Sequence, residues 1–432
     1  MLDKKTKSVV IKIGLTISEK ILASASGKKE VTPGEFVTAK PDLAVNMDTF
    51  FPFAIEALKK VGISKVWNPN KVVVNIDHKV PPESIAAAEK HKVIREFVKA
   101  QAIKYFYDIG RHGITHQLMV ERGHARPGML YVADDTHATT LGALGAFAVA
   151  LGFDILQVLA TGTTWFKVPE SIKFKVEGNL SKGVMSRDII QRILGDIRSC
   201  GALYKAMEFV GSTIDQMNIE GRMTLCNTVN NAGAKTGIIN PDQKTIDYVR
   251  ERTKEPFREV RSDHDAYYDE VFDYEISKLE PQVAIHPNPV DVKPVTEIEG
   301  LEIDQGFIGS CASGRMEDLY IAAKILRNFK VHPNVRMLVV PSSQEVYLSA
   351  MREGLTHTLI QAGAIICAPS CGPCFGLWGV LGDKETCIST SVLNSPGRMG
   401  SHKAKIYLAS AATVAASAIQ GKITDPRDFV KD

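Results

Sequence analysis

The chain has 432 residues, 44% of them hydrophobic and 23% charged, which is the composition of an ordinary globular protein large enough for two or three domains. Its 52 basic and 49 acidic residues give a net charge of +3, and no long run carries a single sign of charge. This balance gives no reason to expect nucleic acid or an anionic membrane as the main partner.

No segment of the sequence is typical of export or of a membrane span. The N-terminal run begins with basic residues, but Lys12 interrupts its apolar part before it reaches the roughly 7–15 residues of a secretory core. Nowhere do about 18 apolar residues follow one another without a charge. We therefore expect a cytoplasmic protein. Its seven cysteines are too few for a disulfide scaffold, and in a reducing compartment clustered cysteines indicate metal ligands or catalytic groups.

Short β-branched runs alternate with helical patterns along the whole chain, so we predict an α/β protein. The strand runs suit burial on both faces, as in parallel sheets, and each leads into a polar or glycine-rich loop. In chain order the predicted elements are a helix that begins at the capping box of Thr16 and Glu19, strands over 71–77 and 129–137, a tightly packed helix over 141–152, an amphipathic helix over 185–197, strands over 335–343 and 364–367, and a helix between Ser410 and Gly421.

One proline-rich segment, 278–295, has neither a helical nor a strand period. Such composition is typical of an extended linker, so we place a domain boundary there. The predicted domains are an α/β body over 1–280 made of two interleaved lobes, a linker over 281–295, and a third α/β domain over 296–432.

The run "CAPSCGPC" brings Cys367, Cys371 and Cys374 together, and three chemistries compete for these cysteines. Cys371 and Cys374 could form a redox dithiol, but such a pair is expected near the start of a small domain. All three could hold the cluster of a radical enzyme, although nothing else in the chain asks for a nucleotide methyl donor. Alternatively, two of them could join the distant Cys311 around an iron–sulfur cluster that acts as a Lewis acid.

Acid–base residues follow the ends of predicted strands in three loops. The first loop carries Asp77 and His78, the second carries His116, and the third carries Asp135 and His137. A carboxylate beside an imidazole fixes its tautomer and raises its pKa, which suits an acid that protonates a leaving hydroxyl. Because sites in α/β sheets lie beyond the carboxyl ends of strands, we expect these loops to meet.

Two further stretches carry candidate substrate-binding residues. Arg398 lies in a Pro-Gly turn, where its guanidinium could bind a carboxylate with bidentate geometry. Asn227 and Asn231 offer amides in a stretch of otherwise small residues.

Taken together these motifs resemble the aconitase superfamily, most closely its 3-isopropylmalate dehydratase large-subunit branch. The similar runs extend over almost the whole chain, and their number and order are very specific for the superfamily. They include "GLTISEKIL", "DHKVPPES", "HGITHQ", "ADDTHATTLGALG", "TWFKVPESIKF", "GRMTLCN", "LEPQVA", "GSCASGRMEDL", "CGPCFG" and "PGRMGSHKAKIYLASAATVAASAIQGKITDP".

The resemblance implies the fold, the cofactor and the ligands. The fold would be a set of aconitase-like α/β/α sandwiches with parallel-rich sheets, without the C-terminal swivel domain of larger relatives. One [4Fe-4S] cluster would be held by Cys311, Cys371 and Cys374, and Cys367 would fall outside the ligand set. The iron that no cysteine binds would take the hydroxyl and a carboxylate of a small dicarboxylate substrate and act as a Lewis acid.

The resemblance also implies the roles of the other residues. His78, supported by Asp77, would give a proton to the leaving hydroxyl. His116, Asp135 and His137 would surround the iron, and Arg398 would hold a substrate carboxylate. In larger relatives a serine on the swivel domain takes the carbon-bound proton, so we expect this chain to need a small subunit that carries that domain.

Departures from the family pattern bear on the substrate. Asn231 stands where a glutamate is usual, and Val392 and Leu393 replace the Asn-Arg pair that usually precedes the Pro-Gly turn. In addition, Ala312 and Ser313 change the "GSCTNGR" motif, and Thr136 replaces a serine. These changes make the pocket less charged and more apolar, and we place Leu393 among the substrate-binding residues with Asn227 and Arg398.

The resulting prediction is a hydro-lyase that reversibly dehydrates an alkyl-substituted malate, with 2,3-dimethylmalate as the preferred substrate and dimethylmaleate as the product. The first alternative is dehydration of 3-isopropylmalate. The second is an RNA-binding regulator with reduced catalysis, against which the retained cysteines and Asp-His pairs and the near-neutral charge both count.

Overall fold

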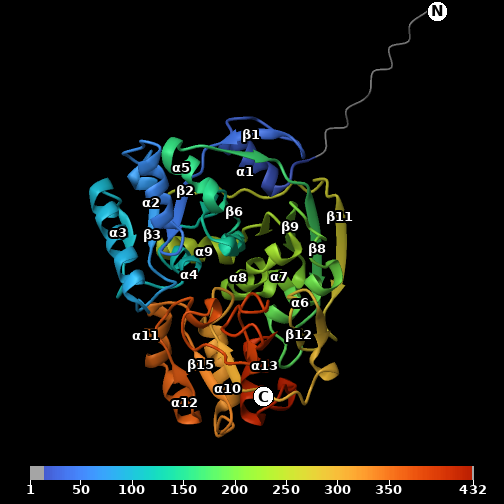
Figure 1. Ribbon diagram of the computed structural model, residues 1–432. Helices are drawn as coiled ribbons and strands as arrows, with labels where there is room; N and C mark the ends of the chain where they lie inside the picture. Colours follow the sequence, from blue (N-terminus) through green and yellow to red (C-terminus); the bar gives the residue numbers. More distant parts are fainter. Residues whose placement is uncertain (1–13, 431–432) are drawn as a thin grey trace, which may run out of the picture.

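The structure, a computed structural model, describes residues 14–430, which form two parts that lie one above the other (Figure 1). The upper part is coloured blue to yellow and the lower part orange to red, so the division follows the sequence. Residues 1–13, the basic start of the run in which we predict no secretory signal, lie outside the described residues. Within 14–430, no helix combines the length and apolar character of a membrane span.

The first sheet of the upper part contains β2 (Leu43–Met47), β3 (Val72–Asn75), β4 (Tyr105–Tyr107), β5 (Leu130–Ala133) and β6 (Phe147–Ala150). Its strands are parallel and lie in the order β4-β3-β2-β5-β6. Every residue of β2, β3 and β5 is buried, which explains the unbroken apolar runs of the sequence. The helices of this region are α2 (Phe51–Lys60), α3 (Ile85–Gln101), α4 (Thr115–Glu121) and α5 (Ile155–Thr161).

A second parallel sheet completes the upper part. Its strands lie in the order β10-β9-β8-β11, and they are β8 (Ser171–Glu177), β9 (Ala206–Val210), β10 (Thr236–Ile239) and β11 (Glu270–Glu275). Its helices are α6 (Ser186–Ile197), α7 (Ser212–Gln216), α8 (Ile219–Asn227) and α9 (Gln243–Arg252). One apolar core contains residues of both sheets, for example Tyr131 and Phe174. The two sheets therefore belong to a single body.

A small antiparallel ribbon and one helix lie at the top of this body in Figure 1. They are β1 (Phe36–Ala39), β7 (Thr164–Lys167) and α1 (Ile17–Ala25). The predicted capping box of α1 is confirmed, because the Glu19 amide donates to Thr16 Oγ1 at 3.3 Å and the Thr16 amide donates to Glu19 Oε2 at 2.8 Å.

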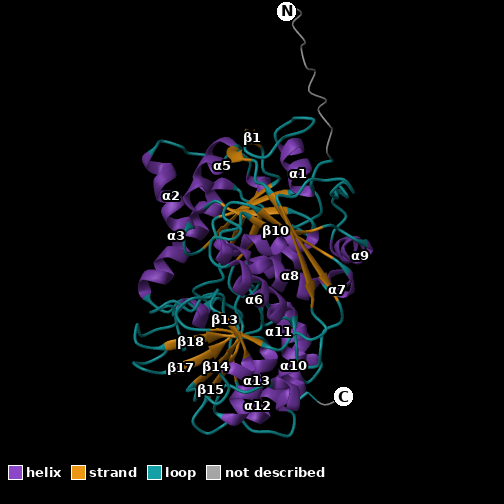
Figure 2. Ribbon diagram, turned by 90° about the vertical axis from the view of Figure 1, so that its right-hand side faces the viewer, coloured by secondary structure: helices purple, strands orange, loops and turns teal. Residues whose placement is uncertain are grey.

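The lower part is built on a seven-stranded sheet in the order β13-β12-β18-β17-β14-β15-β16 (Figure 2). The strands from β14 to β18 are parallel, and β12 and β13 add antiparallel strands at one edge. The strands are β12 (Gln282–Ala284), β13 (Val292–Pro294), β14 (Gln305–Ile308), β15 (Arg336–Val339), β16 (Ile365–Ile366), β17 (Thr386–Ser389) and β18 (Lys405–Leu408). The helices are α10 (Met316–Leu326), α11 (Gln344–Arg352), α12 (Leu355–Ala362) and α13 (Ala411–Gln420).

Short 3-10 helices interrupt several loops. They are η1 (Pro69–Lys71), η2 (Thr136–Leu144), η3 (Gly152–Asp154), η4 (Val229–Ala232), η5 (Val295–Glu297), η6 (Gly372–Phe375) and η7 (Pro426–Asp428). The predicted packed helix over 141–152 is wrong, because its first residues end η2 and Phe147–Ala150 form strand β6.

The segment predicted as a linker, 281–295, differs from that expectation. It contains β12 and β13, which pair with each other and join the lower sheet through β18. Pro281 and Pro294 mark the ends of this paired segment, and β13 is the edge strand, where a residue without an amide hydrogen is tolerated. The segment between the body and the lower part is therefore paired into the lower sheet and is not a free linker.

The contact between η2 and β10 yields a prediction for stability. A Cβ atom on Gly142 would lie 1.7 Å from the carbonyl oxygen of Gly237, which is backbone and cannot rotate away. We expect Gly142→Ala to lower the free energy of unfolding by about 1–3 kcal/mol or more through overpacking. Urea unfolding followed by circular dichroism measures this loss. Gly382→Ala is the control, because its Cβ would meet only the Glu385 side chain at 3.6 Å, and an equal loss there would contradict the argument.

Candidate active site

The groups of the site follow strand ends on both sides of the junction between the two parts. β3, β2 and β5 are neighbours in the upper sheet, and β17, β14, β15 and β16 are neighbours in the lower sheet. One cavity of about 250 Å³ contains side chains that follow β3, β4 and β5 of the upper sheet and β14, β16 and β17 of the lower sheet. The sequence-predicted residues that line it are Asp77, His78, His116, Asp135, His137, Cys311, Cys371, Cys374, Leu393 and Arg398.

The lower part supplies the three thiols. Cys311 follows β14. In the loop after β16, Cys371 directly precedes η6 and Cys374 lies within it. They rest on an apolar cluster that includes Ala312 and Met399, and all are free thiols. A hydrogen bond from Cys371 and the charge of Arg398 hold the pKa of the Cys374 thiol well below its usual range, although burial acts against them.

The loop after β3 carries the first acid–base pair. Nδ1 of His78 lies 2.7 Å from Oδ1 of Asp77, whose Oδ2 accepts hydrogen bonds from the amide of Thr115 at 2.8 Å and from its hydroxyl at 2.7 Å. Burial lowers the pKa of His78, but the charge of Asp77 and hydrogen bonds to the Asp48 and Asp77 carboxylates outweigh it. The net pKa lies well above the ordinary value, so His78 carries a proton at neutral pH.

The second cluster joins the loop after β5 to α4. Oδ1 of Asp135 lies 2.9 Å from Nε2 of His116 and accepts a hydrogen bond from the His137 amide at 2.8 Å. Burial raises the pKa of Asp135, but its hydrogen bonds to His116 and His137 hold that pKa well below the usual range. For His137, burial lowers the pKa, but the charge of Cys311 and the hydrogen bond to Asp135 outweigh burial and raise the pKa to about 10.

Arg398 brings a cation to the thiol side of the cavity. Its Nη2 lies 3.7 Å from Sγ of Cys374, and its guanidinium lies over the Phe375 ring at 4.8 Å from the centroid. Its Nε is buried and has no hydrogen-bond partner among the described residues. Arg398 therefore keeps a donor free for an anionic ligand in the cavity.

An apolar wall forms another side of the cavity. Its residues come from the end of β2 and the loop after it, from the loop before α4, from η6 and from the loop after β17. They are Met47, Phe50, Ile114, Phe375, Val392 and Leu393. The wall is the place where an alkyl group of a ligand could be buried.

Asn227 is a predicted substrate-binding residue that does not line the cavity. Its side chain is fully buried, and its Nδ2 donates to Thr140 Oγ1 at 2.7 Å and to the carbonyl of Cys311 at 3.3 Å. Asn227 thus supports the backbone that carries Cys311. Asn231, the other amide of this stretch, donates from Nδ2 to the carbonyl of Val392 at 3.2 Å.

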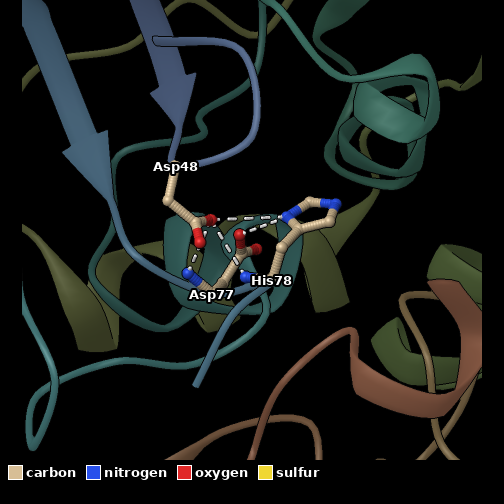
Figure 3. Close-up of side chains that lie close together, drawn as sticks. All are labelled: Asp48, Asp77 and His78. Atoms are coloured by element: carbon tan, nitrogen blue, oxygen red, sulfur yellow. Dashed lines mark hydrogen bonds and ion pairs between the residues drawn. The ribbon is translucent and has the colours of Figure 1, made fainter. Parts of the chain in front are cut away.

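Sequence reasoning missed two buried residues beside the site. Asp48 follows β2 and lies against Asp77 and His78, with ligand atoms of all three within 4.8 Å of one another (Figure 3). The run "AVNMD" ends in an aspartate just as the run "VVNID" does, so the signal was present but lacked a neighbouring histidine. Arg315 was missed because, in the motif that contains it, attention went to Cys311 and to the departures at Ala312 and Ser313.

The residues of the site suit an iron–sulfur cluster. Three thiols that form no disulfide line one cavity, and the pKa of one of them, Cys374, is lowered by a hydrogen bond from Cys371 and by the charge of Arg398. The buried Nε2 of His137 and Nδ1 of His116 have no partner among the described residues, so they are free for a ligand. Thiolates beside imidazoles and a guanidinium form a suitable donor set for a cluster that also binds an anion.

Comparison with known proteins gives consistent results. The chain matches the sequence model of the aconitase family (aconitate hydratase) over residues 19–299 and 291–421. It is 46% identical over 420 residues to 3-isopropylmalate dehydratase large subunit 1 of Methanopyrus kandleri, covering 97% of this chain and 100% of that protein. It is 48% identical over 416 residues to a probable 3-isopropylmalate dehydratase large subunit of Methanothermobacter thermautotrophicus, covering 96% and 99%.

Two further matches complete the comparison. The 3-isopropylmalate dehydratase large subunit of Aquifex aeolicus is 48% identical over 426 residues, covering 97% of this chain and 98% of that protein. Among solved structures, the holo-form of Thermococcus kodakaraensis aconitase X aligns with 91% of this chain and 90% of its own, at 13% identity and a TM-score of 0.48. That last likeness is too low to support a conclusion about this chain.

The contacts of Arg315 yield a second prediction. Its buried guanidinium donates from Nε to Gln117 Oε1 at 3.1 Å, from Nη1 to Thr224 Oγ1 at 3.0 Å, and from Nη2 to the carbonyl of Cys311 at 2.6 Å. Arg315→Leu leaves three buried acceptors without this donor, so we expect the free energy of unfolding to fall by about 3–5 kcal/mol.

The same urea unfolding assay measures this loss on the cluster-free chain. Arg95→Leu is the matched control. The Arg95 guanidinium makes two hydrogen bonds to Asp108, but this pair lies at the surface and is not buried. Surface ion pairs contribute about 0–1 kcal/mol. Equal losses in the two variants would contradict a special role of Arg315.

Proposed function

The chain belongs to the aconitase family, and we propose that it is the cluster-bearing large subunit of a hydro-lyase that reversibly dehydrates a 3-alkylmalate, with 3-isopropylmalate as the first candidate substrate. The observation that carries this proposal is the composition of one cavity. Thiols, Asp-His pairs, a guanidinium and an apolar wall all line it, so it has a place for each part of such a substrate.

We propose Cys311, Cys371 and Cys374 as the ligands of a [4Fe-4S] cluster. When bound, such a cluster leaves one iron without a cysteine, and that iron acts as a Lewis acid on the substrate hydroxyl. Cys367 is outside this set because it does not line the cavity, and its Sγ lies 3.8 Å from the carbonyl of Ile365.

His78 is suited to protonate the leaving hydroxyl. Its Nδ1 is held by Asp77, so Nε2 is the atom that can give a proton to the ligand in the cavity. Nε2 also lies 3.9 Å from Oδ2 of Asp135, which connects the two acid–base groups. Arg398, with its free Nε, is suited to bind a carboxylate of the substrate.

The apolar wall supports an alkyl substituent but does not distinguish an isopropyl group from two methyl groups. The named relatives are 3-isopropylmalate dehydratase large subunits, and they favour that substrate over 2,3-dimethylmalate. We therefore place 3-isopropylmalate first. 2,3-Dimethylmalate stays the second candidate because Val392 and Leu393 present branched apolar side chains to the cavity.

A small-subunit partner is part of the proposal, since the relatives are named large subunits. The described residues that line the cavity include no serine, so the base that takes the carbon-bound proton is expected to come from that partner.

The ligand assignment predicts how cysteine variants bind iron. Cys311→Ser should lose most of its iron and sulfide after anaerobic reconstitution, because a serine hydroxyl is a poor ligand for such a cluster. Cys367→Ser should bind iron and sulfide as the unaltered chain does. Chemical analysis of both elements measures the difference. Loss of the cluster in Cys367→Ser, or its retention in Cys311→Ser, would contradict the assignment.

The function itself is tested on the complex of this chain with its small subunit. We expect dehydration of 3-isopropylmalate, followed by the ultraviolet absorbance of the alkene product, with kcat/KM above those for 2,3-dimethylmalate and unsubstituted malate. Leu393→Ser should raise KM for 3-isopropylmalate roughly 10-fold by removing apolar contact. Leu348→Ser, at an exposed position of α11 outside the cavity, is the control. A preference for unsubstituted malate would overturn the proposal.

A further inference from the structure

Asp48 is a buried carboxylate immediately behind the acid–base pair of the cavity. It follows β2, the strand that lies between β3 and β5, and only 1% of it is exposed. It does not line the cavity, so it cannot touch a ligand there. Its contacts are directed instead to Asp77, His78 and Lys79 (Figure 3 shows the first two).

Both carboxylate oxygens of Asp48 accept hydrogen bonds from consecutive backbone amides. Oδ1 accepts from the amide of Asp77 at 3.2 Å and from that of His78 at 3.0 Å, and Oδ2 accepts from the amide of Lys79 at 3.0 Å. Three successive amides held by one carboxylate leave the turn after β3 little freedom. The backbone position of His78 is therefore set from β2.

The same carboxylate also lies near the imidazole. Oδ1 is 3.6 Å from Nδ1 of His78, whose closer partner is Asp77 at 2.7 Å. Oδ2 lies 3.3 Å from Nε2 of His91, a buried residue of α3. His91 therefore contacts one carboxylate oxygen of Asp48, whereas His78 lies near the other.

Burying a carboxylate here costs more free energy than burying a neutral side chain would, so a purely structural role does not explain the charge. Burying a charge is unfavourable unless it is paired, and the ion-pair partners of Asp48 are the two histidines, since none of the described lysines or arginines forms an ion pair with it. A neutral asparagine or serine could accept some of the same amide hydrogen bonds at lower cost. The negative charge is therefore of use at this position, and its neighbour in the cavity is His78.

We propose that Asp48 is a positioning residue for His78: it fixes the backbone over 77–79 and, together with Asp77, occupies the Nδ1 side of the imidazole so that Nε2 is presented to the cavity. This inference rests on the proposed role of His78 as proton donor. Asp48 acts through His78 and not on the substrate.

Asp48→Asn is the test variant, because asparagine has the same shape but only one acceptor oxygen. Its amide nitrogen must then face either the amides of Asp77 and His78 or the donors at Lys79 and His91, and it can accept from none of them. Asp42→Asn is the matched control. Asp42 lies just before the other end of β2, and its Oδ2 accepts a hydrogen bond from the amide of Leu130 at 2.9 Å.

Two measurements are made on the reconstituted complex and on the full chain. In the complex, Asp48→Asn should lower kcat roughly 10–100-fold with less than about a 3-fold change in KM, since the donor is misplaced while substrate binding groups remain. In the full chain, hydrogen–deuterium exchange should increase in peptides covering 76–80 for Asp48→Asn and not for Asp42→Asn. If Asp48→Asn does not fold, His91→Leu removes one partner of Asp48 and should give a smaller loss of kcat, about 3–10-fold.

Several outcomes would overturn the inference. An unchanged kcat, an effect on KM alone, or equal behaviour of Asp48→Asn and Asp42→Asn would make Asp48 an ordinary structural residue. Loss of iron from Asp48→Asn would mean that it acts through the cluster ligands and not through His78. If the unaltered complex dehydrates no alkylmalate, the proposed function fails, and the exchange comparison alone then decides whether Asp48 anchors 77–79.

Discussion

The site exists because two parallel sheets direct their carboxyl ends toward the same junction. In a parallel sheet all strands end at one edge, so residues that follow neighbouring strands meet there even when they are far apart in the sequence. The upper sheet brings the acid–base groups to the junction and the lower sheet brings the thiols. Neither part alone contributes both the acid–base groups and the thiols to the cavity. Hydrogen bonds from Arg315 to Gln117 and from Asn227 to the Cys311 carbonyl cross between the two parts, so more than one buried contact fixes the position of Cys311 relative to the upper part.

Burying so many ionisable groups at one junction is possible because their charges are paired. Asp77 faces His78, Asp135 faces His116, and Arg398 faces Cys374. Each pair offsets part of the cost of removing its members from water, and each also fixes a protonation state that chemistry can use. A carboxylate that holds an imidazole in its protonated form prepares a proton donor. Pairing is therefore both a condition for folding and the source of reactivity.

Local patterns in the sequence predicted the α/β class, and local patterns together with the resemblance to the aconitase superfamily indicated most of the residues that line the cavity. Asp77 with His78 and Asp135 with His137 each follow an apolar run, and strand ends are where such sites form. The features that the sequence did not reveal depend on pairing between distant segments. The proline-rich segment was interpreted as a linker, but its β12 pairs with both β13 and β18, and its β13 forms the edge of the lower sheet. The Asn227 amide donates to the Cys311 carbonyl, a contact that spans 84 positions of the chain. Asp48 follows a strand without a histidine beside it, so its partner could be identified only in three dimensions.

The apolar wall and the departures from the family pattern belong to one arrangement. Val392 and Leu393 follow Ser391, whose carbonyl accepts a hydrogen bond from the buried Arg187 at 2.7 Å, and the Val392 carbonyl accepts one from Asn231 at 3.2 Å. A glutamate in place of Asn231, as the family resemblance leads one to expect, is ionised at neutral pH and could not donate that hydrogen bond. The amide at 231 and the aliphatic pair at 392 and 393 therefore support each other: one fixes the backbone that the other two use to present an apolar surface. The amide that replaces the usual carboxylate is thus connected by its hydrogen bond to Val392, one of the apolar residues that line the cavity.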